Sequence, residues 1–133
     1  GLRGAPAGDL YIFVEVAGHP IFERDGSNLY IDVPVPMVTA TLGGAIEVPT
    51  LGGKMTRLQI EKGTQSGRKF RMRGKGMPAV RGGAHGDQIV EIIVETPTRL
   101  SKKQINLLKE FDEAGDASPQ TKGFIDRVKT LWS

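Results

Sequence analysis

Residues 62–86 form the stretch whose side chains offer the most chemistry, with seven lysines or arginines, several glycines and no acidic residue. One interpretation is a nucleic-acid-binding β module that uses the basic strand and loop 68–81. Its phosphate contacts would come from Lys69, Arg71, Arg73 and Lys75. Base stacking also needs aromatic side chains, and only Phe70 lies in the run, in a strand phase that buries it. A solvated strand face is therefore favoured, and nucleic-acid binding is kept as the alternative.

The glycine–lysine turns at residues 52–54 and 74–76 have only a superficial likeness to phosphate-binding loops. A P-loop needs Ser or Thr after the lysine, at a helix N-terminus, and neither lysine here is followed by one. His19 and His85 lie in expected turns, without the convergent partners of a metal site or a catalytic triad. The sequence has no cysteine. We therefore expect no enzyme, and no metal or other cofactor in this chain.

Composition is typical of a soluble globular protein. The chain has 133 residues, a formal net charge of +3, 38% hydrophobic and 25% charged residues. That length suits one domain, or one small domain with attachments. The charge by itself is too small to indicate a nucleic-acid or membrane partner. No apolar run approaches the roughly 20 residues that span a bilayer.

The elements that would position the basic stretch are mainly β-strands. Leu29, Ile31, Val33 and Val35 alternate with exposed positions, which predicts a half-buried strand. Pro34 in this strand cannot donate to a ladder, so we expect a free edge there. Residues 88–94 are almost continuously apolar and predict a central strand. The full set of expected strands is 10–16, 29–35, 45–50, 54–60, 68–73 and 88–94, of which 45–50 and 54–60 form a hairpin.

Three segments have helical character. Residues 37–42 are followed by Gly43 and Gly44 and predict a short helix. Ser101 and Gln104 form a capping box for a helix that ends near Gly115, and a linker at 116–120 separates it from a second amphipathic helix at 121–132. The apolar positions of these two helices are Ile105, Leu108, Phe111, Phe124, Val128 and Leu131. The last helix has little domain left to pack against, so we expect a partner subunit to cover it.

Residues 2–16 and 80–94 share one sequence pattern. The two segments align without a gap, beginning with Leu2 on Val80. Gly8-Asp9 coincides with Gly86-Asp87, and the inward apolar positions coincide as well. We interpret the pattern as two copies of one β unit, of which the first contributes only its last strand. The chain is then expected to be a fragment, cut just before the end of the first copy. Asp9 and Asp87 are expected to cap turn backbone.

Five segments agree in order and spacing with a known family. They are residues 8–11 (GDLY), 19–30 (HPIFERDGSNLY), 42–51 (LGGAIEVPTL), 70–76 (FRMRGKG) and 81–87 (RGGAHGD). This set resembles the C-terminal region of bacterial DnaJ, the J-domain co-chaperone family, and the match spans roughly residues 1 to 115.

The resemblance implies a mainly β fold: an antiparallel two-layer β-sandwich with one short internal helix and C-terminal dimerisation helices. Residues 1–17 would finish a first substrate-binding domain, residues 18–97 would form a second, and residues 98–133 would form the dimerisation segment. The J domain and the zinc module of the family would lie upstream of this chain.

The resemblance also implies a function. The chain would belong to a cytoplasmic, non-enzymatic co-chaperone that binds unfolded polypeptide, forms a homodimer and, in the full-length protein, delivers clients to a DnaK-type chaperone. In the family, the first substrate-binding domain takes the client in an apolar groove beside an edge strand. Because the second domain is interpreted as a repeat of the first, the matching groove residues here are Ile31, Val33, Ile46 and Val48. Neither a membrane nor a bound cofactor is expected.

Overall fold

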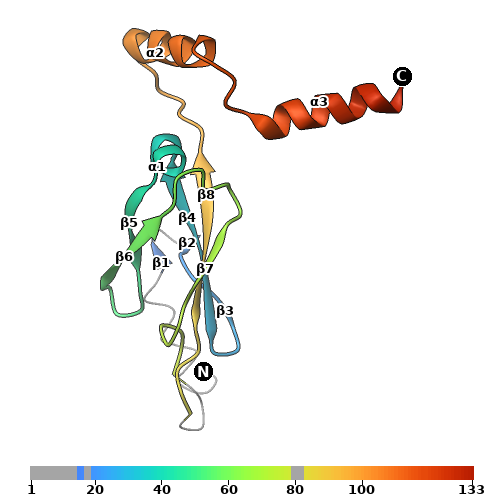
Figure 1. The fold of residues 1–133 in the computed structure, drawn as a ribbon. Coiled ribbons are helices and arrows are strands. Elements are labelled where there is room, and N and C mark those ends of the chain that lie inside the picture. The colour runs from blue at the N-terminus through green and yellow to red at the C-terminus, as the bar shows by residue number, and fades with distance from the viewer. Residues whose placement is uncertain (1–14, 17–18, 79–82) are drawn as a thin grey trace. The chain divides into compact units, whose positions relative to one another are not determined.

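The computed structural model describes residues 15–16, 19–78 and 83–133. It divides into two compact units, Gly1–Thr96 and Pro97–Ser133, of which the first is mostly β and the second is helical (Figure 1). The prediction of a mainly β chain with one short internal helix and helices at the C-terminal end is confirmed. None of the helices in the described ranges combines the length and the apolar character that a bilayer crossing requires.

A four-stranded sheet forms the centre of the β unit. Its strand order is β3 (Glu23–Asp25), β4 (Asn28–Pro36), β8 (Gln88–Glu95) and β7 (Lys69–Met72). The apolar strand β8 therefore occupies a central position, as its composition predicts. A separate two-residue pair, β1 (Glu15–Val16) and β2 (His19–Pro20), is antiparallel. Most of the strand expected at 10–16 lies outside the described residues.

One pairing corrects the prediction of an entirely antiparallel arrangement. Strands β4 and β8 run parallel, with Leu29 opposite Gln88 and Pro36 opposite Glu95. Parallel neighbours need a long crossover connection. The chain between them supplies it, because it passes through a helix and three further strands before it returns. Alternation in sequence identifies the buried face of each strand but carries no information on the direction of its neighbour.

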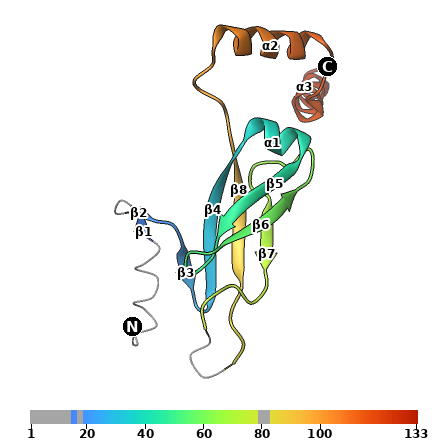
Figure 2. The same cartoon turned by 90° about the vertical axis from the view of Figure 1, so that its left-hand side faces the viewer.

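A hairpin of β5 (Gly44–Pro49) and β6 (Met55–Ile60) covers one face of this sheet (Figure 2). The backbone N–H of Thr50 donates to the carbonyl of Lys54 and closes the predicted turn, with a distance of 2.8 Å between N and O. The helix α1 (Met37–Leu42) precedes β5 and ends where the Gly43 N–H donates to the Thr39 carbonyl. Gly43 has a φ of 84°, a left-handed conformation that glycine adopts without strain.

The core lies between the sheet and the hairpin. The inward residues of β4 are those that alternation predicts, and the side chains of Leu29 and Val35 are completely buried. Burial of each such side chain contributes about 1.5–3 kcal/mol relative to exposure. The buried apolar cluster consists of Phe22, Leu29, Ile31, Val33, Val35, Ala40, Val48, Ile60, Met77, Val90 and Ile92.

The helical unit contains α2 (Lys102–Glu113) and α3 (Pro119–Leu131). The predicted capping box is confirmed, because the Ser101 hydroxyl accepts from the Gln104 N–H and the Gln104 side chain accepts from the Ser101 N–H. The expected linker at 116–120 is too long by two residues. Pro119 and Gln120 belong to α3, since proline at the first helical position has the required φ and loses no hydrogen bond there.

Candidate functional site

One edge of β4 is open over most of its length. Strand β3 pairs only with residues 28–30, and beyond Tyr30 none of the described strands pairs with β4 on that side. The Leu29 N–H donates to the Asp87 carbonyl, on the β8 side. Because backbone groups alternate along a strand, the backbone of Asp32, Pro34 and Pro36 faces the open edge. The free edge expected from Pro34 is confirmed.

Two prolines of β4, Pro34 and Pro36, determine which backbone hydrogen bonds the open edge can form. Proline has no N–H, and within sheets it is confined to positions that do not donate to a neighbour. Pro34 and Pro36 both occupy such positions, so the pairing of β4 with β8 loses nothing. The carbonyl of Pro36 serves as the N-cap acceptor of α1, so the open edge is left with two carbonyl acceptors, those of Asp32 and Pro34, and a single N–H donor, that of Asp32. An incoming strand would therefore find fewer partners here than on an ordinary edge.

A hollow of about 450 Å³ lies along this edge. Ile31 and Val33, both predicted groove residues, line it, although their side chains are only 4% and 9% exposed. The other two predicted residues are elsewhere: Val48 is fully buried in the core and Ile46 packs against the core, and neither lines the hollow. The full lining is Ile21, Glu23, Tyr30, Ile31, Asp32, Val33, Pro34 and Pro49.

Tyr30 is the lining residue that the sequence interpretation missed. It is 37% exposed and lies between the inward positions Leu29 and Ile31. An aromatic side chain at an outward position of an alternating strand is the signal that could have identified it, because large exposed aromatics are common in binding surfaces. Ile21 and Pro49 come from other segments, and their approach to β4 depends on the tertiary fold.

The described part of the glycine-rich loop, residues 74–78 and 83–86, is hydrogen-bonded to the turn between β3 and β4. The Met77 N–H donates to the Ser27 carbonyl at 2.8 Å, the Gly86 N–H donates to Met77, and the Gly76 N–H donates to Gly86. A Cβ placed on Gly86 would lie 2.1 Å from the Ser27 oxygen, so only glycine permits this approach. The loop therefore belongs to the scaffold that holds the beginning of β4, where β4 pairs with β3.

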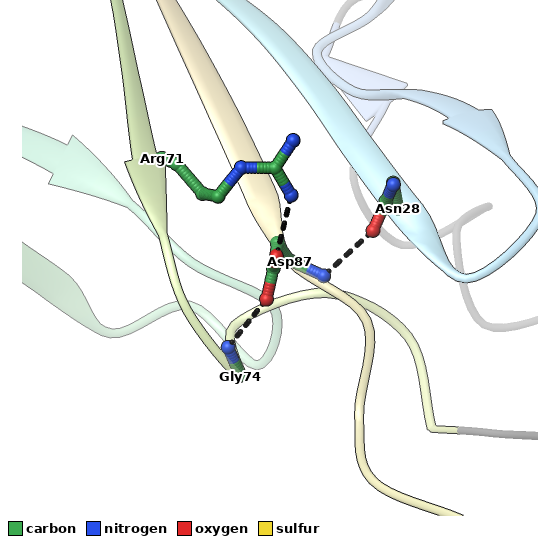
Figure 3. Close-up of polar contacts among 4 residues, drawn as sticks. All are labelled: Asn28, Arg71, Gly74 and Asp87. Atoms are coloured by element: carbon green, nitrogen blue, oxygen red, sulfur yellow. Dashed lines mark hydrogen bonds and ion pairs between the residues drawn. The ribbon is translucent and has the colours of Figure 1, made fainter.

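Asp87 makes further polar contacts between the loop, β7 and β4 (Figure 3). Its carboxylate accepts the Gly74 N–H at 3.0 Å and forms an ion pair with Arg71, while its own N–H donates to the Asn28 side chain at 2.8 Å. The expectation that Asp87 caps turn backbone is confirmed. The Gly74 N–H, followed by the Arg71 guanidinium, lowers the pKa of the Asp87 carboxyl below its ordinary value of 3.8.

We expect the carboxyl of Asp87 to titrate below pH 3.8 in the folded protein. A lowered folded-state pKa means that the ionised carboxylate favours the fold; this contribution is complete above the ordinary pKa and is lost as the pH falls through the folded-state pKa. Side-chain carbonyl NMR shifts against pH measure it. Arg71→Met should raise the midpoint, and Lys69→Met, which removes a cation from the same strand face, should change it less. Equal midpoints in all three proteins would contradict the assignment.

Part of the basic stretch is engaged within the protein. Phe70 and Met72 face inward and Lys69 and Arg71 face outward, as alternation predicts. Arg71 pairs with Asp87. The guanidinium carbon of Arg68 lies 4.8 Å from the centroid of the Phe70 ring, a cation–π arrangement. The aromatic ring inside the basic run is therefore occupied, which favours the interpretation as a strand face over that as a nucleic-acid surface.

The apolar faces of α2 and α3 are not covered within the described helical unit. None of the residues of either helix is buried. Of the predicted dimerisation residues, Ile105, Phe111, Phe124 and Leu131 are exposed, and Leu108 and Val128 are half-buried. Trp132, which follows α3 and extends its apolar side, is also exposed. Sequence reasoning left out two further exposed apolar side chains on these helices, Leu107 and Ile125.

Comparison with known proteins places the chain in a family. Residues 1–97 match a family model described as DnaJ C terminal domain, and residues 103–133 match one described as Chaperone protein DnaJ C-terminal region. The chain belongs to the DnaJ C-terminal domain family. The resemblance found in the sequence motifs is thereby confirmed.

Individual DnaJ proteins align with nearly the whole chain. A protein named Chaperone protein DnaJ from Ruegeria pomeroyi is 59% identical over 133 residues, which are 99% of this chain and 35% of the relative. The proteins of the same name from Paramagnetospirillum magneticum and Rhodospirillum centenum are 53% and 51% identical over 99% and 100% of this chain, and 36% of each relative is covered. The chain thus spans about a third of the length of these DnaJ relatives.

Proposed function

We propose that this chain is the client-binding and dimerisation part of a DnaJ-type co-chaperone. The observation that carries the proposal is the open edge of β4 with its adjoining apolar hollow, in a chain that belongs to the DnaJ C-terminal family. Unfolded polypeptide exposes both unpaired backbone and large apolar side chains. An edge with free carbonyls beside an apolar hollow offers partners for both kinds of group.

The two prolines of β4 determine how a client segment would bind at the open edge. A client segment donates its N–H groups to the carbonyls of Asp32 and Pro34, and receives a backbone donor only from Asp32. An apolar client side chain enters the hollow between Tyr30 and Val33. With few backbone bonds, each contact is weak and sequence-tolerant, which suits a protein that must hold and release many different chains.

Two copies joined through the helical unit would present two such edges. The second contact of one client chain is then intramolecular, so that overall affinity rises without any new type of contact. In the full-length protein the held client would pass to a DnaK-type chaperone in the cytoplasm. This chain itself would take no catalytic role and no cofactor, and the zinc module of the family would lie elsewhere in the protein.

Replacement of Tyr30 by alanine tests the edge. We expect Tyr30→Ala to weaken binding of a permanently unfolded, fluorescently labelled client about tenfold, because truncation removes much of the apolar wall of the hollow. Fluorescence anisotropy measures the affinity, and the far-UV circular dichroism spectrum checks the fold. Met55→Ala is the control, since Met55 is also an exposed apolar residue, on β6, and does not line the hollow. Equal affinities of the two variants for the client would show that the client site does not lie at β4.

A further inference from the structure

A second and larger hollow lies between the β5–β6 turn and the glycine-rich loop, with a volume of about 800 Å³. Phe22, which is 2% exposed, lies at its base, and Leu51 and Pro78 contribute apolar walls. The volume falls within the range of about 300–1,000 Å³ that is usual for ligand sites. One or two large apolar side chains would fit into it.

The charged side chains that line this hollow are of one sign. They are Lys54 and Lys75, His85 lies beside them, and among the described lining residues none is Asp or Glu. The nearby carboxylate of Asp87 accepts the Gly74 N–H, and its charge is balanced by the ion pair with Arg71. An occupant with negative charge would therefore meet electrostatic complementarity on more than one side.

Both walls are held by hydrogen bonds before any ligand arrives. In the β5–β6 turn the Gly53 N–H donates to the Thr50 carbonyl, and the Thr50 hydroxyl donates to the Lys54 carbonyl. In the opposite wall the Gly74 N–H donates to Asp87. Gly52, Gly53 and Gly74 have no atom within 4 Å of where a Cβ would lie, so the backbone of both turns is open to an approaching chain.

We propose that this hollow binds an extended acidic peptide segment that carries a large apolar side chain. The apolar side chain is received by Phe22, Leu51 and Pro78, and the flanking carboxylates lie beside Lys54, Lys75 and His85. The site is distinct from the β4 edge, with which it shares only Ile21 and Pro49. It would give this unit a preference for acidic–apolar segments that the β4 edge, with its own Glu23 and Asp32, does not provide.

Labelled peptides test the proposal on the intact 133-residue chain. The probe has a central phenylalanine flanked by aspartates; its comparison peptides have serine in place of phenylalanine, or lysines in place of the aspartates. We expect the probe to bind at least about tenfold more tightly than either comparison peptide. Amide NMR shift changes should fall on residues 50–54 and 74–78. Equal binding of all three peptides, or shift changes confined to other strands, would overturn the proposal.

Two pairs of lysine reversals locate the site. Lys54→Glu with Lys75→Glu should lower affinity for the acidic probe about tenfold or more, whereas Lys62→Glu with Lys69→Glu, the same change of net charge outside the hollow, should alter it less than about threefold. Tyr30→Ala should leave probe binding unchanged, which separates this site from the client edge. If the two reversal pairs have equal effects, or if a single-stranded oligonucleotide binds the hollow more tightly than the probe, the proposed peptide site is refuted.

Discussion

Gly86→Ala is expected to lower the free energy of unfolding of the β unit by about 3 kcal/mol, the upper range for overpacking of a well-packed interior. A Cβ at this position would lie 2.1 Å from the carbonyl oxygen and 2.4 Å from the carbonyl carbon of Ser27. Both atoms are backbone, so no side-chain rotation relieves the clash. Any retreat of the loop also lengthens the hydrogen bonds that Gly86 makes with Gly76 and Met77.

Urea unfolding followed by the amide NMR signals of β4 and β8 measures this effect on the β unit alone. Gly52→Ala is the matched control, because Gly52 has a left-handed φ of 89° but open space around its Cβ position. That variant should lose only the roughly 1–2 kcal/mol of backbone strain. If Gly86→Ala were no less stable than Gly52→Ala, the close approach of the glycine-rich loop to Ser27 would not exist in solution.

Much of the fold was accessible from the sequence because the signals concerned are local. Alternation from Leu29 to Val35 identifies the buried face of β4, since side chains on a strand alternate strictly between two faces. The Ser101–Gln104 capping box and the double glycine after α1 likewise depend on contacts within a few residues. The outward position of Arg71 on β7 follows from the same rule, although its pairing with Asp87 does not.

Features formed by distant segments could not be predicted in this way. The parallel pairing of β4 with β8, and the approach of the loop at Gly86 to the turn at Ser27, join parts of the chain that are far apart in sequence. The candidate site shows the same limit. Alternation marks Val33 and Val48 equally as inward, but only the tertiary fold places Val33 beside the hollow and Val48 in the closed core.

The prolines of β4 are an instructive intermediate case. Pro34 and Pro36 are two residues apart, so their backbone groups face the same side of the strand. Because neither proline can donate a hydrogen bond, that side of β4 is predicted to be unpaired, whatever strand pairs with the opposite side. The sequence therefore predicts which side of β4 is open, and the structure adds which residues border that side. Client binding at this edge and peptide binding at the basic hollow would then be separable functions of one small unit.

The double substitution Phe124→Asp with Leu131→Asp is expected to convert the proposed dimer into a monomer. Both side chains are exposed on α3, and a chain with this much uncovered apolar helix surface is expected to bury it against a second copy. Loss of two apolar contacts per copy, with charges left in their place, should raise the dimer dissociation constant by about a hundredfold or more, equivalent to about 3 kcal/mol.

Sedimentation velocity at about 20 µM, where ordinary dimers with micromolar affinity are associated, distinguishes the two states. Gln120→Asp with Thr121→Asp adds the same charge in the first turn of α3, where the helix dipole favours it, and should remain dimeric. The far-UV circular dichroism of both variants should match that of the parent, so that lost helix is not mistaken for lost association. A parent chain that sediments as a strict monomer would refute the role of these helices, because the apolar faces of α2 and α3 would then require a different partner.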